Sequence, residues 1–346
     1  MCDHFVLVMG VEKFVEYIRH VRLVFPASPL DIVIGNSGGD YDSFISTLMF
    51  SYFQHLRNGR VFYPIISFPA DNLKLRRDIV HGMSIIGLGE KDLIYVDELK
   101  GHGVNEVQLV DHNVIDSPLV NGKVVGIIDH HNDGNQYKSA DPRIIEVCGS
   151  CSSLVLREFA PEVVKAGLDD KEKKFMSAAI LLDTGGLERR VESVDIQSWK
   201  GISYNQEVGT LSREFIDAKA NIEGLSVYDL LRKDYKEWTT GKIKLGISST
   251  IVPLEEIEKD KEAIGNWIRN RELDILLVMG AFEKDGKFTR ELSIHSPSVH
   301  VGKIAMLLKE ELHLEGNGPI YEQKRVEWSR KKVAPFAIDV FSTLTK

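Results

Sequence analysis

Residues 124–131 read Val-Val-Gly-Ile-Ile-Asp-His-His, and this stretch decides the fold class of the chain. A short apolar run of this kind is typical of a strand that is buried on both faces. It stops in a carboxylate and two imidazoles, Asp129, His130 and His131, and all three groups bind metals in proteins. Because open α/β sheets bind ligands at the carboxyl ends of their strands, the stretch predicts a metal site at such an edge.

Three further apolar segments also lead into aspartates. We expect these segments to be strands of the same sheet, so that their acids converge on one site. Carboxylates that converge repel one another, and divalent cations relieve that repulsion. The segments and their acids are residues 30–36 with Asp40 and Asp42, residues 107–110 with Asp111, and residues 178–182 with Asp183.

Strand and helix signals alternate from residue 30 to about residue 200, which favours a parallel sheet with crossover helices. Pro161 should end the helix that precedes it. The expected strands are 30–35, 61–68, 93–97, 107–111, 124–129 and 178–183, and the expected helices are 11–22, 43–57 and 151–159.

A chain of 346 residues is too long for one ordinary core, so we expect two domains. A charged, helix-prone stretch ends near Gly224, and the chain beyond it has strand signals at 243–248 and 273–279. The expected division is a metal-binding domain over 1–217, a linker over 218–225 and a substrate-binding domain over 226–346.

The composition, 43% hydrophobic and 27% charged residues, is that of a soluble globular protein. The net charge of −8 argues against general binding to nucleic acids or acidic membranes. A polyanionic substrate therefore needs a local basic patch or bound metals. The apolar run 5–11 is too short for a membrane span and lacks the pattern of a signal peptide.

The three cysteines suggest no disulfide framework, and reduced cysteines fit an intracellular protein. Cys148 and Cys151 form one CxxC, which would allow a redox pair, but no second CxxC completes a zinc site. We expect Cys151 to begin a helix that is capped near Ser150.

The combined motifs resemble those of the DHH phosphoesterase superfamily: Asn36-x-x-x-Asp40-x-Asp42, Asp111-His112-Asn113, Asp129-His130-His131 and Asp183. Residues 329–332, Ser-Arg-Lys-Lys, followed by Pro335, are similar to the phosphate-binding signature of the DHHA2 branch. The resemblance extends to residues 149–153 and 234–236, and covers roughly residues 30 to 340. It is closest to the eukaryotic exopolyphosphatases, with the family II pyrophosphatases and the prune-like phosphatases as relatives.

The resemblance implies an α/β fold in which a doubly wound, parallel-sheet DHH domain precedes a smaller α/β DHHA2 domain, with the active site in the cleft between them. It implies two divalent metal ions, magnesium, manganese or cobalt. Asp111 would bridge them, and Asp129 would orient an imidazole. The implied metal ligands are Asp40, Asp42, Asp111, His130 and Asp183.

The implied activity is that of an exopolyphosphatase, in which a hydroxide activated by two metals attacks the terminal phosphorus and orthophosphate leaves. His131, Lys236 and Arg330 would be catalytic. These three, together with Lys331 and Asn36, would bind the polyphosphate substrate. If the strand continues past Asp129, His130 and His131 should point to opposite faces. We expect a cytoplasmic monomer that binds neither nucleic acid nor membrane, with an organellar pool left open.

Three alternatives stay open. A family II pyrophosphatase would carry His where this chain has Asn36. A prune-like enzyme would share Asn36 and would act on short polyphosphates or as a nucleotide phosphodiesterase. A non-catalytic module would bind polyphosphate or a protein partner without turnover. A nuclease is disfavoured, because residues 315–318, Glu-Gly-Asn-Gly, replace the glycine-rich loop of the DHH nucleases.

Overall fold

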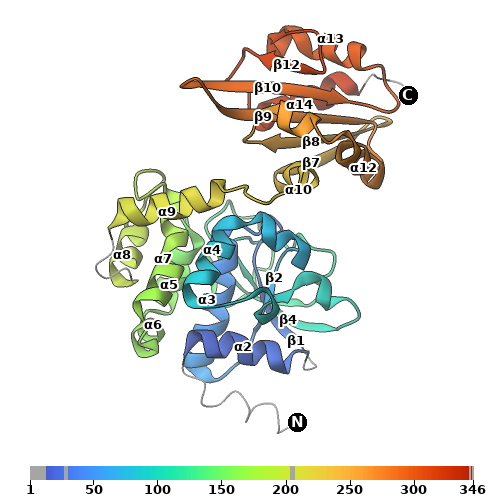
Figure 1. Cartoon of the computed structure of the whole chain (residues 1–346). Coiled ribbons are helices and arrows are strands. Elements are labelled where there is room, and N and C mark those ends of the chain that lie inside the picture. The colour runs from blue at the N-terminus through green and yellow to red at the C-terminus, as the bar shows by residue number, and fades with distance from the viewer. Residues whose placement is uncertain (1–12, 27–29, 203–206, 343, 345–346) are drawn as a thin grey trace. The chain divides into compact units, whose positions relative to one another are not determined.

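The computed structural model describes residues 13–26, 30–202, 207–342 and 344. The chain folds into two compact units, Met1–Asn221 and Ile222–Lys346 (Figure 1). Asn221 and Ile222 both belong to the segment 218–225 that was expected to link two domains. The division of roles between these domains stays a prediction.

The first unit contains a six-stranded parallel sheet in the order β3-β2-β1-β4-β5-β6. The strand order reverses between β1 and β4, and ligands bind at the carboxyl ends of strands at such a point. The strands are β1 Leu30–Ile34, β2 Tyr63–Ile66, β3 Ile94–Tyr95, β4 Val104–Val110, β5 Lys123–Asp129 and β6 Arg143–Ile145.

Helices pack around this sheet. Helix α3 is buried along most of its length and packs on β1, β2, β4 and five other helices, so its first turn is fixed beside the end of β1. The α-helices are α2 Phe14–Val24, α3 Tyr41–Asn58, α4 Arg77–Ile86, α5 Cys151–Glu158, α6 Ala160–Ala166, α7 Asp170–Thr184, α8 Ser193–Ile202 and α9 Val208–Ala220. Short 3₁₀ turns cover Ala70–Leu75, Glu90–Asp92 and Val96–Leu99.

The predicted strand over 178–183 is wrong, because these residues form the last turns of α7. The helix begins at a capping box in which Asp169 accepts from two backbone amides and Glu172 accepts from the Asp169 amide. It ends at Gly185, which has the left-handed φ of 58°. The apolar run is a buried helix face rather than a strand, and periodicity alone does not separate the two over such a short run.

The other predicted elements of this unit need small corrections. The helix before Pro161 ends at Glu158, as predicted, but Pro161 lies in the first turn of α6, where its missing amide costs no hydrogen bond, so a second helix follows directly. The N-terminal helix starts at Phe14, and residues 11 and 12 of the predicted helix lie outside the described residues, as does the apolar run 5–11. Cys151 begins α5 with Ser150 as its N-cap residue, as predicted.

The second unit contains a six-stranded sheet in the order β11-β12-β10-β9-β8-β7. Only the β8–β9 pair is parallel. The elements are α10 Val227–Lys233, β7 Tyr235–Thr240, β8 Ile243–Thr250, α11 Leu254–Glu258, α12 Lys261–Arg271, β9 Ile275–Lys284, β10 Lys287–His295, α13 Val301–Leu312, β11 Leu314–Glu315, β12 Ile320–Gln323 and α14 Arg330–Phe341.

Helices cover both faces of this second sheet. Along β9, Ile275, Leu277 and Met279 belong to an apolar core with α13 and α14. The alternate residues Leu276 and Val278 belong to a separate core with α10 and α12. This alternation is that of a strand buried on both faces. The predicted fold class, a parallel-sheet α/β domain followed by a smaller α/β domain, is confirmed.

Among the described residues, the search for a helix with the length and apolar character needed to cross a membrane finds none.

Candidate metal centre

The first acids of the site lie in the turn between β1 and α3. Asp40 is the N-cap residue of α3, and its Oδ1 accepts from the Ser43 amide at 3.1 Å. The turn is closed by the Gly39 amide, which donates to Asn36 Oδ1 at 3.1 Å. Gly39 has a φ of 54°, and a Cβ there would lie 2.4 Å from the Phe68 ring. The turn therefore requires glycine at position 39.

Asp42 lies in the first turn of α3 and is only 1% exposed. Its carboxylate accepts from the amides of Cys151 at 2.6 Å and Ser152 at 2.9 Å, which are the free amides at the start of α5. The hydroxyls of Ser150 and Ser152 donate to the same carboxylate. These donors stabilise a charged Asp42 in a buried position.

Asp111 follows β4 directly and has the left-handed φ of 59°, which is strained for a residue with a side chain. Its Oδ2 accepts from Asn36 Nδ2 at 2.7 Å and from the Ser43 hydroxyl. Its Oδ1 is buried and accepts no hydrogen bond from a described residue. That oxygen faces two imidazoles, at 3.2 Å from His130 Nε2 and 3.7 Å from His131 Nδ1.

The strand β5 ends at Asp129, so His130 and His131 do not alternate across the sheet. Their ring centroids lie 4.5 Å apart, and both rings face Asp111. His130 Nδ1 is 3.0 Å from the Cys148 carbonyl, which fixes Nδ1 as the donor and leaves Nε2 directed at the carboxylates. His131 Nδ1 is 2.8 Å from Asp129 Oδ1, and the His131 side chain is 56% exposed.

Asp129 is fully buried and lies behind the imidazoles. Burial opposes its ionisation, but hydrogen bonds from His131 and from Asn113, at 2.5 Å, lower the pKa of Asp129. The same hydrogen bond with Asp129 raises the pKa of His131. Asp129 therefore orients an imidazole and keeps a proton on its Nδ1.

The carboxylates of the site raise one another's pKa. Burial raises the pKa of Asp183, in the last turn of α7, and the charges of Asp42, Asp40 and Asp111 raise it further. Burial and then the charge of Asp42 raise the pKa of Asp40. Burial also raises the pKa of Asp111 to about 7, although the nearby His130 imidazole opposes this shift. The site therefore carries more negative charge than its own hydrogen-bond donors compensate.

Two groups of ligand atoms fit a cation. Asp111, His130 and His131 form one group, and Asp42, His130 and Asp183 form the other; within each, the ligand atoms lie within 4.8 Å of one another. Asp40 belongs to neither group. Carboxylate oxygens and imidazole nitrogens suit magnesium, manganese and related divalent ions, and the buried Asp111 Oδ1 lacks a hydrogen-bond donor. The residues present thus fit a divalent metal.

Asp195, at the start of α8, is a residue of the site that the sequence gives no means to find. It is fully buried and accepts from the amides of Gly149 at 2.8 Å and Ser150 at 3.2 Å, and from the Ser153 hydroxyl at 2.6 Å. It thereby holds the turn that presents donors to Asp42. An isolated Asp at a helix start carries no local signal for such a distant contact.

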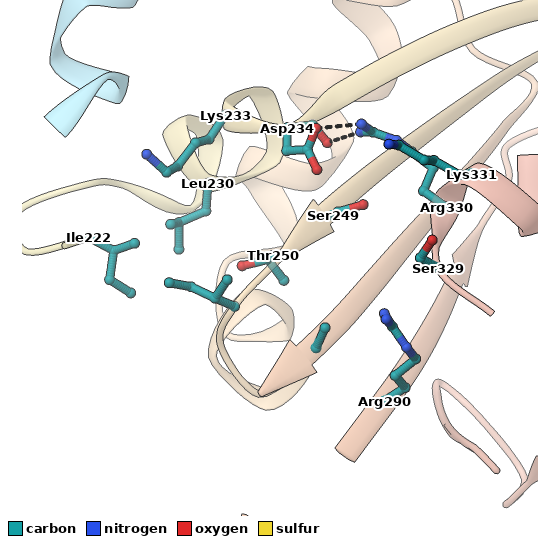
Figure 2. A pocket seen from close by; sticks show the side chains of 12 residues that line it. Ile222, Leu230, Lys233, Asp234, Ser249, Thr250, Arg290, Ser329, Arg330 and Lys331 are labelled. Carbon is teal, nitrogen blue, oxygen red and sulfur yellow. Dashed lines mark hydrogen bonds and ion pairs between the residues drawn. The ribbon is translucent and has the colours of Figure 1, made fainter. Parts of the chain in front are cut away.

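Of the predicted phosphate ligands of the second unit, Arg330 and Lys331 line one pocket, and Lys236 is not part of its lining. Arg330 begins α14 and donates to the Asp234 carbonyl and to Asp234 Oδ1, each at 2.5 Å. Arg330 and Lys331 line a pocket of about 350 Å³ within this unit (Figure 2). Lys236 is exposed on β7 and does not line this pocket. Two basic residues of the lining, Lys233 and Arg290, were not predicted.

Comparison with known proteins gives consistent relatives. Residues 213–340 match the DHHA2 domain family. The chain is 28% identical over 368 residues to a Schizosaccharomyces pombe protein with the provisional name exopolyphosphatase, covering 95% of this chain and 96% of that protein. It is 23% identical over 362 residues to Homo sapiens exopolyphosphatase PRUNE1, covering 94% of this chain and 79% of the relative.

The pyrophosphatases form a second group of relatives. The chain is 23% identical over 326 residues to the manganese-dependent inorganic pyrophosphatase of Methanocaldococcus jannaschii, covering 88% of this chain and 96% of that protein. A crystal structure from Methanococcus jannaschii, provisionally of a family II inorganic pyrophosphatase, matches the fold with a TM-score of 0.54 at 21% identity, covering 90% and 99% of the two chains. Residues 213–340 therefore form a DHHA2 domain, and the predicted kinship of the chain with the DHH/DHHA2 phosphoesterases is confirmed.

Proposed function

We propose that this chain is a metal-dependent exopolyphosphatase that releases terminal orthophosphate from inorganic polyphosphate. One observation carries the proposal: Asp42, Asp111, His130 and Asp183 converge, and the buried Asp111 Oδ1 among them has no hydrogen-bond donor. Such a cluster is costly to bury without a cation. The similarity over most of the chain to relatives named exopolyphosphatase supports the choice of substrate.

Asp40, Asp42, Asp111, His130 and Asp183 would hold two divalent ions, magnesium, manganese or cobalt. Such ions, when bound, polarise phosphoryl oxygens and lower the pKa of the attacking water. Asp40 caps α3 through Oδ1 alone, which accepts a hydrogen bond from the Ser43 amide. The cap therefore does not use the other carboxylate oxygen of Asp40. Asp40 therefore serves as both cap and ligand.

The remaining residues of this site orient the ligands and contact the substrate. Asn36 and Ser43 hold Asp111 Oδ2, which directs Oδ1 into the cluster. His131 is the most exposed imidazole of the group and carries a proton on the nitrogen that faces Asp129. Its other nitrogen would donate to a phosphoryl oxygen of the substrate when the ring is protonated, which its raised pKa favours.

Basic side chains of the second unit would bind the phosphates of the polyphosphate substrate. Arg330 offers a planar fork and Lys331 a point charge, and both line one pocket. Lys236, on the neighbouring β7, is a further exposed cation. Arg330 shares its fork with Asp234, so a phosphate would compete with that carboxylate or bind to the remaining N–H groups.

Pyrophosphate is the rival substrate, because the chain is also similar to a manganese-dependent pyrophosphatase. A pyrophosphatase has only two phosphates to bind, whereas four basic side chains line the pocket of the second unit. This surplus of cations favours a longer anion. A prune-like nucleotide phosphodiesterase activity would instead require turnover of a cyclic or linear nucleotide.

The test is phosphate release by the full chain from tripolyphosphate, longer polyphosphate, pyrophosphate and a cyclic nucleotide, each with magnesium, manganese and cobalt. The proposal expects polyphosphates to be the best substrates, and it expects Asp111→Ala and Asp183→Ala to lose both bound manganese and turnover. Preference for pyrophosphate would reassign the chain to its rival function. Absence of turnover with every metal would leave a non-catalytic binding module.

A further inference from the structure

Arg290 is a cation of the second unit that has no acidic partner among the described residues. It lies on β10 and is partly buried against the pocket that Arg330 and Lys331 also line. Burial alone lowers its pKa, since no carboxylate lies near enough to oppose the shift. A partly desolvated guanidinium without a counter-ion is unfavourable, so an anion is the ligand that such a group would take.

The guanidinium of Arg290 is held in place from one side only. Its Nε donates to the Val326 carbonyl at 2.5 Å, and its Cζ lies 5.1 Å from the centroid of the Phe288 ring. The two terminal nitrogens make no hydrogen bond to a described residue. Figure 2 shows the side chain directed toward Ser329, at the start of α14. The fork is therefore oriented before any ligand arrives.

Arg330 differs from Arg290 in this respect. Both of its terminal nitrogens donate to Asp234, which is the one carboxylate of the pocket lining. Its charge is thus largely compensated within the protein. The free guanidinium fork of this pocket belongs to Arg290, although the Ser-Arg-Lys-Lys signature directs attention to Arg330.

Two further donors of the pocket lack partners in the described structure. The hydroxyl of Thr250 is buried and makes no hydrogen bond. Ser329 is the N-cap residue of the 12-residue helix α14, yet its hydroxyl makes no cap bond. An unpaired hydroxyl and the free amides of a helix start are both groups that phosphate oxygens satisfy.

The pocket is also larger than one phosphate needs. Its volume of about 350 Å³ lies in the range of sites for small organic ligands, and its lining carries four basic side chains and one carboxylate. Each internal phosphate of a polyphosphate carries one negative charge. A chain segment of several phosphates therefore matches this lining better than a single orthophosphate.

We propose that Arg290, with Thr250 and Ser329, binds a phosphate of an inorganic polyphosphate chain and thereby sets the preference for polyphosphate over pyrophosphate. This inference rests on the proposed function. Arg290 acts as a specificity-determining residue, because it contacts a phosphate away from the reacting phosphorus. Its loss should raise the KM for polyphosphate and leave kcat unchanged.

The experiment compares Arg290→Met, which removes the charge at similar length, with Arg290→Lys, which keeps the charge but loses the fork. Arg269→Met is the matched control, since Arg269 contacts Asn266 outside this pocket. Calorimetry of the full-length protein in EDTA measures binding of tripolyphosphate, a longer polyphosphate and pyrophosphate. Steady-state assays with manganese then give kcat and KM for the same three ligands.

The inference expects Arg290→Met to weaken polyphosphate binding, and to raise the polyphosphate KM, by about tenfold or more, the loss typical of one charge-assisted contact. Arg290→Lys should recover part of this loss, and Arg269→Met should show none. Equal losses for pyrophosphate and polyphosphate, or unchanged polyphosphate binding, would overturn it. If polyphosphate binding depends on Arg290 but the wild-type protein hydrolyses nothing, the proposed activity fails and the binding role stands.

Discussion

Asn36 Nδ2 lies 2.7 Å from Asp111 Oδ2 and 3.1 Å from the Asp111 carbonyl, so one amide spans the point where the strand order reverses. The other end of the same amide accepts from Gly39, which closes the turn that carries Asp40. One neutral side chain thus links the turn after β1 to the acid after β4. Its oxygen is occupied within the protein, and its nitrogen is turned toward the acid.

The exchange Asn36→His should move the ratio of tripolyphosphate to pyrophosphate turnover toward pyrophosphate. An imidazole nitrogen is a stronger metal ligand than an amide, and the resemblance gives pyrophosphatases His at this position. Asn36→Ala serves as the control, because it removes the donor to Asp111 without adding a ligand. It should lower turnover of both substrates without changing their ratio. A ratio that is the same in Asn36→His and wild type would remove Asn36 as the discriminator.

Stability of the metal-free protein should fall as the pH rises from about 4 to about 7. Burial raises the pKa of Asp111 from 3.8 to about 7, with Asp42 and Asp40 adding to the shift and His130 opposing it. A group whose pKa is higher in the folded state contributes stability below its unfolded pKa, and that stability is lost as the pH rises through the folded value.

Manganese should reverse this dependence, because it competes with protons for Asp111 and binds better as the pH rises. The measurement is Tm against pH in EDTA and in manganese chloride. The increase in Tm on adding manganese should grow across this window and should be nearly flat in Asp111→Asn. An increase that is equal at every pH would show that Asp111 takes no part in the metal site.

The conversion Asp195→Ala should weaken manganese binding although Asp195 is not a predicted ligand. The substitution leaves the buried amides of Gly149 and Ser150, and the amide of Glu192, without their acceptor, at a cost of about 1–3 kcal/mol for each buried group. The turn that they form presents donors to Asp42 and should lose its position. Manganese affinity should fall by about tenfold or more, the usual effect of losing a group that supports a ligand.

A general loss of stability would not weaken manganese binding in this way. The variant Asp274→Ala is the control that separates lost stability from lost manganese affinity. Asp274 accepts from the Lys244 amide at 2.8 Å in the second unit, so its removal should destabilise that unit and leave manganese binding intact. Isothermal titration of both variants with manganese, at a temperature where each is folded, makes the comparison. Normal manganese affinity in Asp195→Ala would limit Asp195 to a structural role.

The sequence predicted the parts of the site that follow apolar strands. The runs before Asp111 and Asp129 are strands at the centre of the sheet. A short apolar run that stops at a polar residue is the pattern that predicted them. The run before Asp183 carried the same signal but belongs to a helix, because capping residues six or more positions before the run decided its conformation. The acid still reaches the site, since the carboxyl end of α7 and the ends of the strands converge.

The remaining parts of the site depend on contacts between distant segments. Asp195 and Gly149 are separated by 46 residues, and neither the Asp nor its surroundings has a local pattern that predicts the pairing. Arg290 is one arginine in a strand of mixed composition, and its lack of a counter-ion is visible only when the pocket is assembled. The pairing of Arg330 with Asp234 likewise joins residues 96 positions apart.

Substituting Arg330 and substituting Asp234 should change polyphosphate turnover in opposite directions. Arg330→Ala removes a guanidinium from the pocket and should lower turnover at subsaturating polyphosphate by about tenfold, which corresponds to about 1.4 kcal/mol. Asp234→Asn keeps the volume and the backbone carbonyl that accepts from Arg330, but it removes the negative charge beside the fork, so the charge of Arg330 becomes available to phosphate. Asp234→Asn should therefore bind polyphosphate more tightly than wild type.

Both variants should retain manganese, because every proposed metal ligand lies in the first unit. The checks are kcat/KM for a long polyphosphate and manganese content after gel filtration. If Asp234→Asn weakens binding as Arg330→Ala does, the pair acts as a unit that holds α14, and Arg330 is no phosphate ligand.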